Sequence, residues 1–248
     1  MNAHHPSQLV LDKELLRKED LRLITGQGKF TSDWHYEGMC FAHMIRSPYA
    51  HGQIKHINVS DVRNALGVLR VITSEDVDAA KMQTLPSGVT IQNSDGQAQH
   101  LAPMPILAKG KVLFVGQPIA MVVADTLEHA RQAAELVQLE IDMLDAVTDY
   151  ESALSPDAVQ LHAHVPKNLS IHFSKGDVQA TDKAFEEAHF ISHMKIKSQR
   201  LIGSPMELRS VLAKYDATQD KVTIHTPNQG MLGMLGALEQ ITGIKKDQ

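Results

Sequence analysis

The most apolar stretch of the chain, residues 112–124 (VLFVGQPIAMVVA), limits the possible folds more than any other segment. It is shorter than the roughly 18 apolar residues that a membrane-spanning helix needs. Gly116, Gln117 and Pro118 interrupt it, and proline fixes φ and removes a backbone donor. We therefore predict two strands around a bend, with residues 119–124 forming a strand that is buried on both faces.

An alanine-rich helix is predicted directly after this strand. Its apolar face repeats at helical spacing and consists of Ala130, Ala133, Ala134 and Val137. Side chains this small allow a helix to approach a sheet closely. Asp125 and Glu128 have the spacing of a capping box at the start of the helix. Leu139 and Ile141 lead into a further strand, and the mixture of strands and helices predicts an α+β fold.

Residues 26–57 (GQGKFTSDWHYEGMCFAHMIRSPYAHGQIKHI) predict two strands joined by a turn. Residues 39–45 are mostly apolar, residues 53–59 alternate in polarity, and Pro48 fixes the turn between them. Cys40 is expected to be a buried, inert thiol of the first strand. Arg46 either binds an anionic group or anchors the turn through hydrogen bonds.

The remaining segments contain both loops and regular elements. Residues 79–105 show no apolar period and are predicted to form a long surface loop. Residues 189–199 alternate and predict a strand, and residues 206–215 and 222–226 predict a hairpin around a turn at 216–220. Residues 231–241 predict a helix that stops at Gly243. Pro156 and Pro166 indicate a domain boundary within residues 145–167.

Composition excludes several classes of function. The net charge is -5 and basic residues are not clustered, so nucleic acid is not an expected partner. Cys40 is the only cysteine, whereas an iron–sulfur cluster normally needs about four thiolates, so this chain alone cannot hold one. The first twenty residues lack the apolar segment of a signal peptide. We therefore expect a cytoplasmic protein with no membrane span.

Several short motifs occur in a specific order in the first part of the chain. They are Arg17-Lys18-Glu19-Asp20, Leu23-Ile24-Thr25-Gly26-Gln27-Gly28-Lys29-Phe30, Ile45-Arg46-Ser47-Pro48-Tyr49-Ala50-His51 and Phe114-Val115-Gly116-Gln117-Pro118. This order resembles the large, molybdopterin-binding subunit of the molybdenum hydroxylases, the family of xanthine dehydrogenase, aldehyde oxidase and aerobic carbon monoxide dehydrogenase. Residues 1–20 are polar and are predicted to form a loose segment. The resemblance implies an α/β-hammerhead domain at residues 21–150.

A second group of motifs resembles the beginning of the molybdenum-cofactor domain of the same family. The motifs are Gly176-Asp177, Met206-Glu207-Leu208-Arg209, Lys214-Tyr215-Asp216 and Thr226-Pro227-Asn228-Gln229-Gly230. Residues 151–248 are therefore expected to form the start of a molybdopterin-binding α+β domain. The chain departs from the family at Leu208, where proline is common, at Ser210, where glycine is common, and at Met231-Leu232, where Pro-His is common. The family's glycine-rich cofactor segment and its catalytic glutamate are not found among these residues, so no complete catalytic set is expected.

Gln229 and Gly230 are the candidate cofactor-binding residues. In the family, the glutamine of this Gln-Gly step lies at the molybdenum and donates to an oxygen ligand, a role that suits a neutral amide. The alternative is a turn residue that precedes a helix. Glu207 and Arg209 lie two residues apart on the predicted strand and should share one face, where they either form an ion pair or orient groups near the substrate. No histidine pair has a carboxylate or thiolate at ligand spacing, so no separate metal site is expected.

The resemblance implies part of an oxidoreductase that oxidises a small molecule such as an aldehyde, an N-heterocycle or carbon monoxide. Its electrons would pass to a 2Fe-2S subunit and an FAD-binding subunit. A continuation or second chain would complete the molybdenum domain, and this chain alone is expected to hold no molybdenum cofactor. The alternative hypothesis is a catalytically incomplete fragment with a structural or assembly role. The substrate cannot be predicted from these residues.

Overall fold

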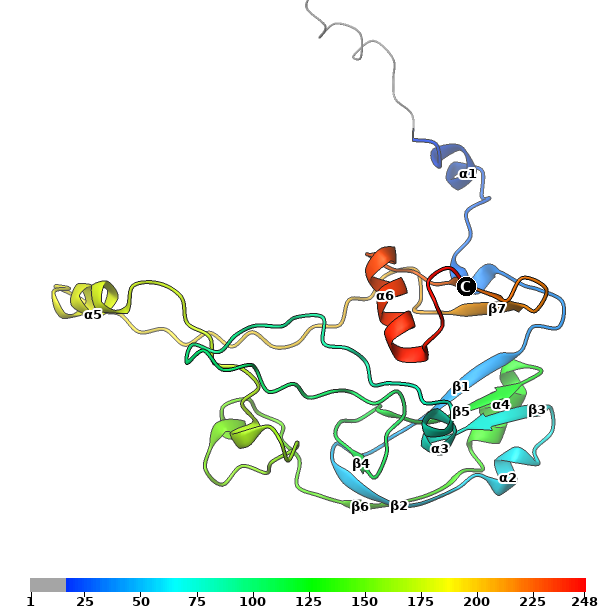
Figure 1. Ribbon diagram of the computed structural model, residues 1–248, viewed down its shortest axis with the longest axis horizontal. Coiled ribbons are helices and arrows are strands. Elements are labelled where there is room, and N and C mark those ends of the chain that lie inside the picture. The colour runs from blue at the N-terminus through cyan, green and yellow to red at the C-terminus, as the bar shows by residue number, and fades with distance from the viewer. Residues whose placement is uncertain (1–16) are drawn as a thin grey trace, which may run out of the picture. The chain divides into compact units, whose positions relative to one another are not determined.

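The computed structural model describes residues 17–248, so residues 1–16 of the predicted loose segment lie outside the described chain. The described residues divide into two compact units. The first unit contains residues 17–35 and 202–229, and the second contains residues 36–201 and 230–248. Figure 1 labels most of the helices and strands. In the first unit, helix α1 (Asp20–Ile24) ends just before Gly26, which has a positive φ of 70°.

A three-stranded antiparallel sheet is the centre of the second unit. Its order is β1 (Phe41–Arg46), β5 (Pro118–Ala124) and β3 (Val68–Ile72), so β5 pairs with a strand on each side. Val122 lies opposite His43 on one side and Val71 on the other. Ile119, Ala120, Val122 and Ala124 are buried, which confirms a central strand after the bend at Pro118. Met121 and Val123 are only partly buried, so the predicted burial on both faces is incomplete.

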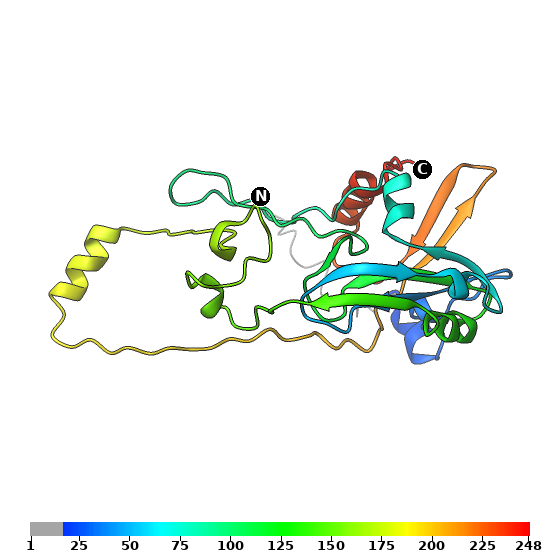
Figure 2. The same ribbon diagram turned by 90° about the horizontal axis from the view of Figure 1, so that it is seen from below.

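A second three-stranded sheet of the same unit has the order β4 (Lys111–Val112), β2 (Gly52–Asn58) and β6 (Gln138–Met143). Strands β2 and β6 are antiparallel neighbours and lie side by side in Figure 2. Gly52 lies where a β-carbon would collide with Ile141 and approach the carbonyl of Asp142. The close approach of the two backbones therefore requires glycine at this position.

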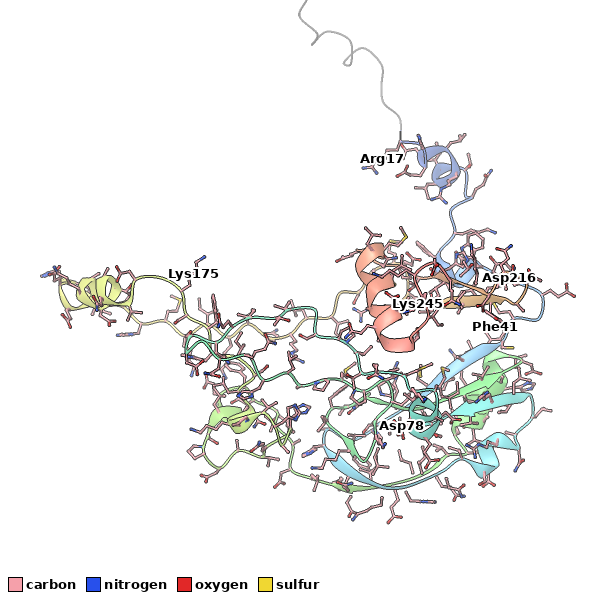
Figure 3. The ribbon with its side chains drawn as sticks, in the orientation of Figure 1. Arg17, Phe41, Asp78, Lys175, Asp216 and Lys245 are labelled. Carbon is pink, nitrogen blue, oxygen red and sulfur yellow. The ribbon has the colours of Figure 1, made fainter. Side chains whose placement is uncertain are left out.

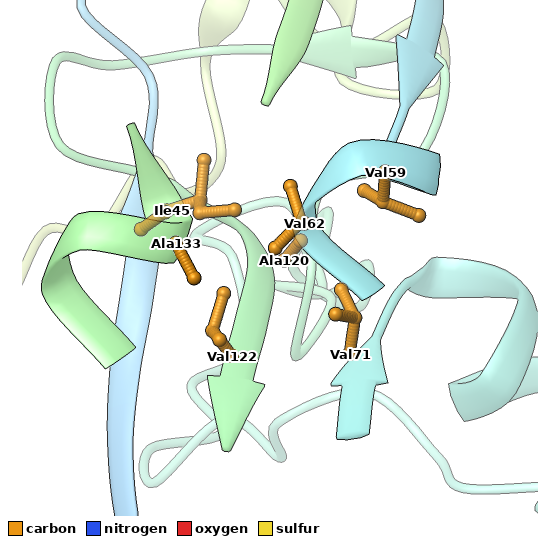
Figure 4. Packing of buried hydrophobic residues seen from close by; sticks show 8 residues of the cluster. Ile45, Val59, Val62, Val71, Ala120, Val122 and Ala133 are labelled. Carbon is orange, nitrogen blue, oxygen red and sulfur yellow. The ribbon is translucent and has the colours of Figure 1, made fainter. Parts of the chain in front are cut away.

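The main core lies between the first sheet and two helices, α2 (Ser60–Arg63) and α4 (Leu127–Ala134). Val62 from α2, Val122 from β5 and Ala133 from α4 meet in this cluster (Figure 4). The predicted alanine face is confirmed, because Ala130, Ala133 and Ala134 are the buried residues of α4. Small side chains on this face allow the helix to pack closely on the sheet.

The predicted capping box at Asp125 is wrong. The N-cap of α4 is Thr126, whose hydroxyl accepts a hydrogen bond from the backbone N–H of His129. The carboxylate of Asp125 instead pairs with Nδ1 of His129 at 2.6 Å. A capping box does occur on α3 (Ser74–Ala79), where Thr73 is the N-cap and Asp76 accepts from the Thr73 backbone. Both helices therefore begin with a threonine cap.

The turn after β1 is fastened to the bend before β5. Arg46 donates from Nη1 to the carbonyl of Gly116 at 2.8 Å, so its predicted role as an anchor of the turn is confirmed. Ser47 is buried, and its backbone N–H donates to the carbonyl of Gln117. His51 is only 4% exposed, and its Nδ1 donates to the carbonyl of Asp145 at 2.7 Å. Residues 46–51 therefore form a packed structural turn.

Cys40 is exposed, so its predicted burial is wrong. Strand β1 begins one residue later, at Phe41, and Cys40 lies between the strand and a turn at Gly38 that has a positive φ of 73°. Its thiol lies 3.7 Å from the carbonyl of Gly38. The apolar residues 39–45 therefore begin two residues before strand β1 does.

Residues 79–105 form the predicted loop, in which two isolated bridges join Leu85 to Met104 and Gln92 to Ala98. Residues 146–201 contain the 3-10 helices η3 (Ser152–Leu154) and η4 (Pro166–Asn168) and the helix α5 (Val178–Glu186). The predicted strand at 189–199 is absent, and the segment runs as an extended trace in Figure 2. It alternates in polarity, but no described segment pairs with it, and a strand requires a neighbour.

The last element of the second unit is the helix α6 (Met231–Thr242), which confirms the predicted helix. It ends at Gly243, whose positive φ of 76° is the left-handed conformation of a helix C-cap. Within the described residues, no helix has the length and apolar character needed to cross a membrane.

Candidate functional site

The candidate cofactor residues follow a hairpin of the first unit, formed by β7 (Leu212–Asp216) and β8 (Lys221–His225). Its turn is organised by Asp216, which is labelled in Figure 3. The Asp216 carboxylate accepts from the hydroxyl of Thr218 at 2.6 Å and from the Thr218 N–H at 2.9 Å, and these bonds lower its pKa. Asp220 accepts from the Tyr215 hydroxyl at 2.9 Å and raises the pKa of that phenol. Local polar contacts therefore determine the register of the hairpin.

The chain reaches Gln229 four residues after β8 ends, at the open end of the hairpin. The last ladder pair joins Leu212 to His225. Beyond it, the hydroxyl of Thr226 donates to the carbonyl of Ser210 at 3.1 Å, which keeps the two chains together for one further step. The side chain of Asn228 donates to the carbonyl of Thr226 at 3.2 Å. The predicted strand at 206–215 is therefore shorter than expected and begins at Leu212.

Gln229 is exposed, and its side-chain amide forms no hydrogen bond with any residue that the structure describes. The amide is therefore available to a ligand. Gly230, the next residue, is the N-cap of α6, and its carbonyl accepts from the N–H of Met234 at 3.1 Å. A β-carbon at Gly230 would meet no heavy atom within 4 Å, so there is open space beside its α-carbon.

Glu207 and Arg209 do not form the expected ion pair. Glu207 instead accepts two hydrogen bonds from Thr31, at 3.0 Å from its N–H and 3.2 Å from its hydroxyl. Arg209 is exposed, and neither residue lies in a strand. Because the chain is outside the ladder at these positions, the two-residue repeat that would place both side chains on one face does not apply.

A contact that sequence reasoning missed joins residue 34 to the same hairpin. The ring of Trp34 stacks on His225, with ring centroids 5.2 Å apart and an interplanar angle of 23°. The ammonium of Lys29 lies 5.5 Å from the centre of the Trp34 ring, within the range of a cation–π contact. Trp34 is the only tryptophan of the chain, and that was the one signal in the sequence that could have drawn attention to it.

The described residues contain no group of three or more histidine, cysteine, aspartate or glutamate side chains that could hold a metal ion. His162 and His164 lie in a turn rather than on a strand, with ring centroids 5.8 Å apart. His164 bonds the carbonyl of Leu101 at 2.7 Å. Partial burial, together with the neighbouring His164, lowers the pKa of His162.

Two family models match most of the chain. Residues 25–145 match the α/β-hammerhead domain of aldehyde oxidase and xanthine dehydrogenase, and residues 161–248 match the molybdopterin cofactor-binding domain. The fold thus defines a protein that joins a hammerhead domain to a molybdopterin cofactor-binding domain. The chain belongs to the molybdenum hydroxylase family of xanthine dehydrogenase and aldehyde oxidase, as the resemblance of its motifs implied.

Curated relatives of the chain are large subunits of oxidoreductases. The chain is 34% identical over 222 residues to the large subunit of nicotine 6-hydroxylase from Paenarthrobacter nicotinovorans, covering 89% of this chain and 26% of that protein. It is 30% identical over 243 residues to the carbon monoxide dehydrogenase large chain of Hydrogenophaga pseudoflava, covering 93% and 29%. The chain therefore spans between 26% and 29% of the length of these two relatives.

Solved structures agree with this assignment. Carbon monoxide dehydrogenase from Oligotropha carboxidovorans matches with a TM-score of 0.82 at 26% identity, over 94% of this chain and 29% of that one. Quinoline 2-oxidoreductase from Pseudomonas putida 86 matches with a TM-score of 0.76 at 29% identity over the same shares. Both matches confirm the expected α+β fold of a hammerhead domain followed by the beginning of a cofactor domain.

Proposed function

We propose that this chain is the N-terminal part of the molybdopterin-binding subunit of a molybdenum-dependent oxidoreductase. The observation that carries the proposal is the Gln229 side chain, which is exposed and forms no hydrogen bond within the described chain. It lies within the segment that matches the molybdopterin cofactor-binding domain. A neutral amide can donate to a ligand oxygen of a metal centre without adding charge to it.

The residues present fit the cofactor. Gln229 would hold it through the amide N–H groups, and the open space beside the α-carbon of Gly230 would allow close approach. When bound, the molybdenum cofactor supplies the redox centre at which the substrate is oxidised. Glu207, which is bonded to Thr31, and the exposed Arg209 would orient groups near the cofactor or the substrate. We place the boundary between the two domains at residues 150 and 151.

The complete site requires further polypeptide. In the relatives, more than two thirds of the subunit lies outside the matched part. The extended segment 189–201 carries Phe190, Met194 and Ile196, which are 82%, 85% and 77% exposed. Three large apolar side chains at these spacings need a partner that removes them from water. We propose that the rest of the cofactor domain, as a continuation or a second chain, covers them.

The further partners would be a 2Fe-2S subunit and an FAD-binding subunit that receive the electrons. The relatives are themselves named as subunits of complexes, and the single cysteine of this chain cannot form a cluster. The substrate would be a small aldehyde, an N-heterocycle or carbon monoxide. We propose a cytoplasmic location, because reducing compartments keep a lone exposed thiol such as Cys40 in its free form.

The experiment is purification of the tagged chain from its own cells, with metal analysis and mass spectrometry of the associated proteins. The expected result is stoichiometric molybdenum only in the fraction that also contains the rest of the cofactor domain and the flavin and iron–sulfur subunits. The chain expressed alone should hold no molybdenum. Tightly held molybdenum in the isolated chain would contradict the proposal. Recovery of the chain with partners but without molybdenum would favour a structural or assembly role.

A further inference from the structure

Residues 29–34 contact the hairpin segment at two points within the first unit. Thr31 donates twice to the carboxylate of Glu207, which lies before β7. Trp34 stacks on His225, the last residue of β8. The ammonium of Lys29 lies over the Trp34 ring, 5.5 Å from the ring centroid. The two chains that emerge from the open end of the hairpin are thus each held by the same short segment.

We propose that Thr31 and Trp34 are positioning residues for the Gln229 segment. Glu207 and His225 are the residues through which they act. The chemical importance of this positioning rests on the proposed cofactor role of Gln229. The contacts themselves do not depend on that role. Residues 29–34 lie near the start of the hammerhead match. The proposal assigns them the role of positioning the residues around Gln229, which lie far away in the sequence.

The physical reason lies in where the two contacts of residues 29–34 attach. They hold Glu207 and His225 at the open end of the hairpin, where Thr226 also donates a hydrogen bond to the carbonyl of Ser210. Gln229 follows with no side-chain bond of its own in the described chain. A displacement of about 1 Å in a group that orients a reacting centre is enough to reduce rates substantially. Fixing His225 and Glu207 limits how far the segment between the hairpin and Gln229 can move.

The test is backbone ¹⁵N relaxation of the full chain, with order parameters measured at Asn228, Gln229 and Gly230. The disruptive variants are Trp34→Ala and Glu207→Ala. The matched controls are Trp34→Phe, which keeps an aromatic ring over His225, and Glu207→Gln, whose side-chain carbonyl still accepts from Thr31. Val222 in β8 serves as the reference for intact folding of the first unit, because it pairs with Tyr215 in the hairpin ladder.

In the wild type we expect rigid values of about 0.8 at Gln229, falling below about 0.6 in both alanine variants, where the backbone becomes flexible. Both conservative variants should restore the wild-type value, and Val222 should not change in any variant. Order parameters at Gln229 that are already low in the wild type, or that are unchanged in the alanine variants, would overturn the inference. A parallel loss of order at Val222 would do the same, because the contacts would then support the whole hairpin.

No cofactor is present in this experiment, so its result is independent of the molybdenum analysis. A rigid Gln229 segment that depends on Trp34, combined with a complex that lacks molybdenum, would leave the positioning role standing and refute the proposed function. Molybdenum in the complex, combined with a Gln229 segment that does not respond to Trp34→Ala, would do the reverse.

Discussion

Gly67→Ala is predicted to destabilise the chain strongly, for two separable reasons. Gly67 has a positive φ of 73°, a conformation that costs an L-residue about 1–2 kcal/mol. A β-carbon there would also collide with Nδ1 of His129 and Oδ1 of Asp125, the two atoms that pair with each other next to α4. Overpacking of this kind costs about 1–3 kcal/mol in addition.

Gly38→Ala is the matched control, because the chain contains the same backbone conformation without the crowding. Gly38 also has a φ of 73°, but a β-carbon there would meet nothing within 4 Å. Both substitutions change the entropy of the unfolded chain equally. The difference between them should therefore isolate the collision, and Gly67→Ala should cost about 1–3 kcal/mol more than Gly38→Ala.

The assay is urea unfolding of the full chain, followed by far-ultraviolet circular dichroism. A third variant, Gly67→Ala with His129→Ala, removes the imidazole from the collision and should recover part of the difference, as a double-mutant cycle reports. Equal losses for Gly67→Ala and Gly38→Ala would refute the reasoning. It would mean that the loop at Gly67 moves away from His129 at no measurable cost.

Three further predictions concern the same unit. Val122→Ala should lower the free energy of unfolding by about 2 kcal/mol, because the fully buried side chain loses its packing against both neighbouring strands; urea unfolding measures this loss, and a change below about 0.5 kcal/mol would contradict the core assignment. The backbone N–H of Thr73 lowers the pKa of Asp76, so this carboxylate contributes stability above its unfolded pKa, and the contribution is lost as the pH falls through its lower folded pKa. Asp76→Asn should remove this pH dependence of the free energy of unfolding, measured in urea at several pH values. An unchanged pH dependence would show that the hydrogen bond between Thr73 and Asp76 does not stabilise the fold. Asn168→Asp should loosen residues 153–168, because Asn168 donates to the carbonyls of Ala153 and Val159 and an aspartate cannot; limited proteolysis should cleave this loop faster, and an unchanged rate would refute the role.

The hammerhead part was predictable from local patterns because its sequence and its packing agree. The strand after Pro118 is apolar at every position, and it is the strand that pairs on both sides. The alanine face of α4 met the core as its spacing predicted. The errors at Asp125 and Cys40 were of one or a few residues, since capping and strand limits depend on hydrogen bonds that the pattern alone does not specify.

The cofactor part was less predictable because its patterns require neighbours. Residues 189–199 have the alternation of a strand, but a strand forms only when another segment satisfies its backbone. Glu207 and Arg209 were expected to share a face, and the chain there is not a strand. Glu207 is bonded to Thr31, which is 176 residues away in the sequence, and no local pattern predicts a contact of this range. The stack of Trp34 on His225 was missed for the same reason.

The most direct test of the central claim compares Gln229→Ala with Gln219→Ala in the purified molybdenum-containing complex. Both residues are exposed glutamines of the first unit, but Gln219 lies in the hairpin turn, at the end opposite to Gln229. The measurement is the electron paramagnetic resonance spectrum of the partially reduced molybdenum centre at equal molybdenum content. We predict an altered spectrum for Gln229→Ala and the wild-type spectrum for Gln219→Ala. A wild-type spectrum for both variants would contradict the claim that Gln229 lies at the cofactor.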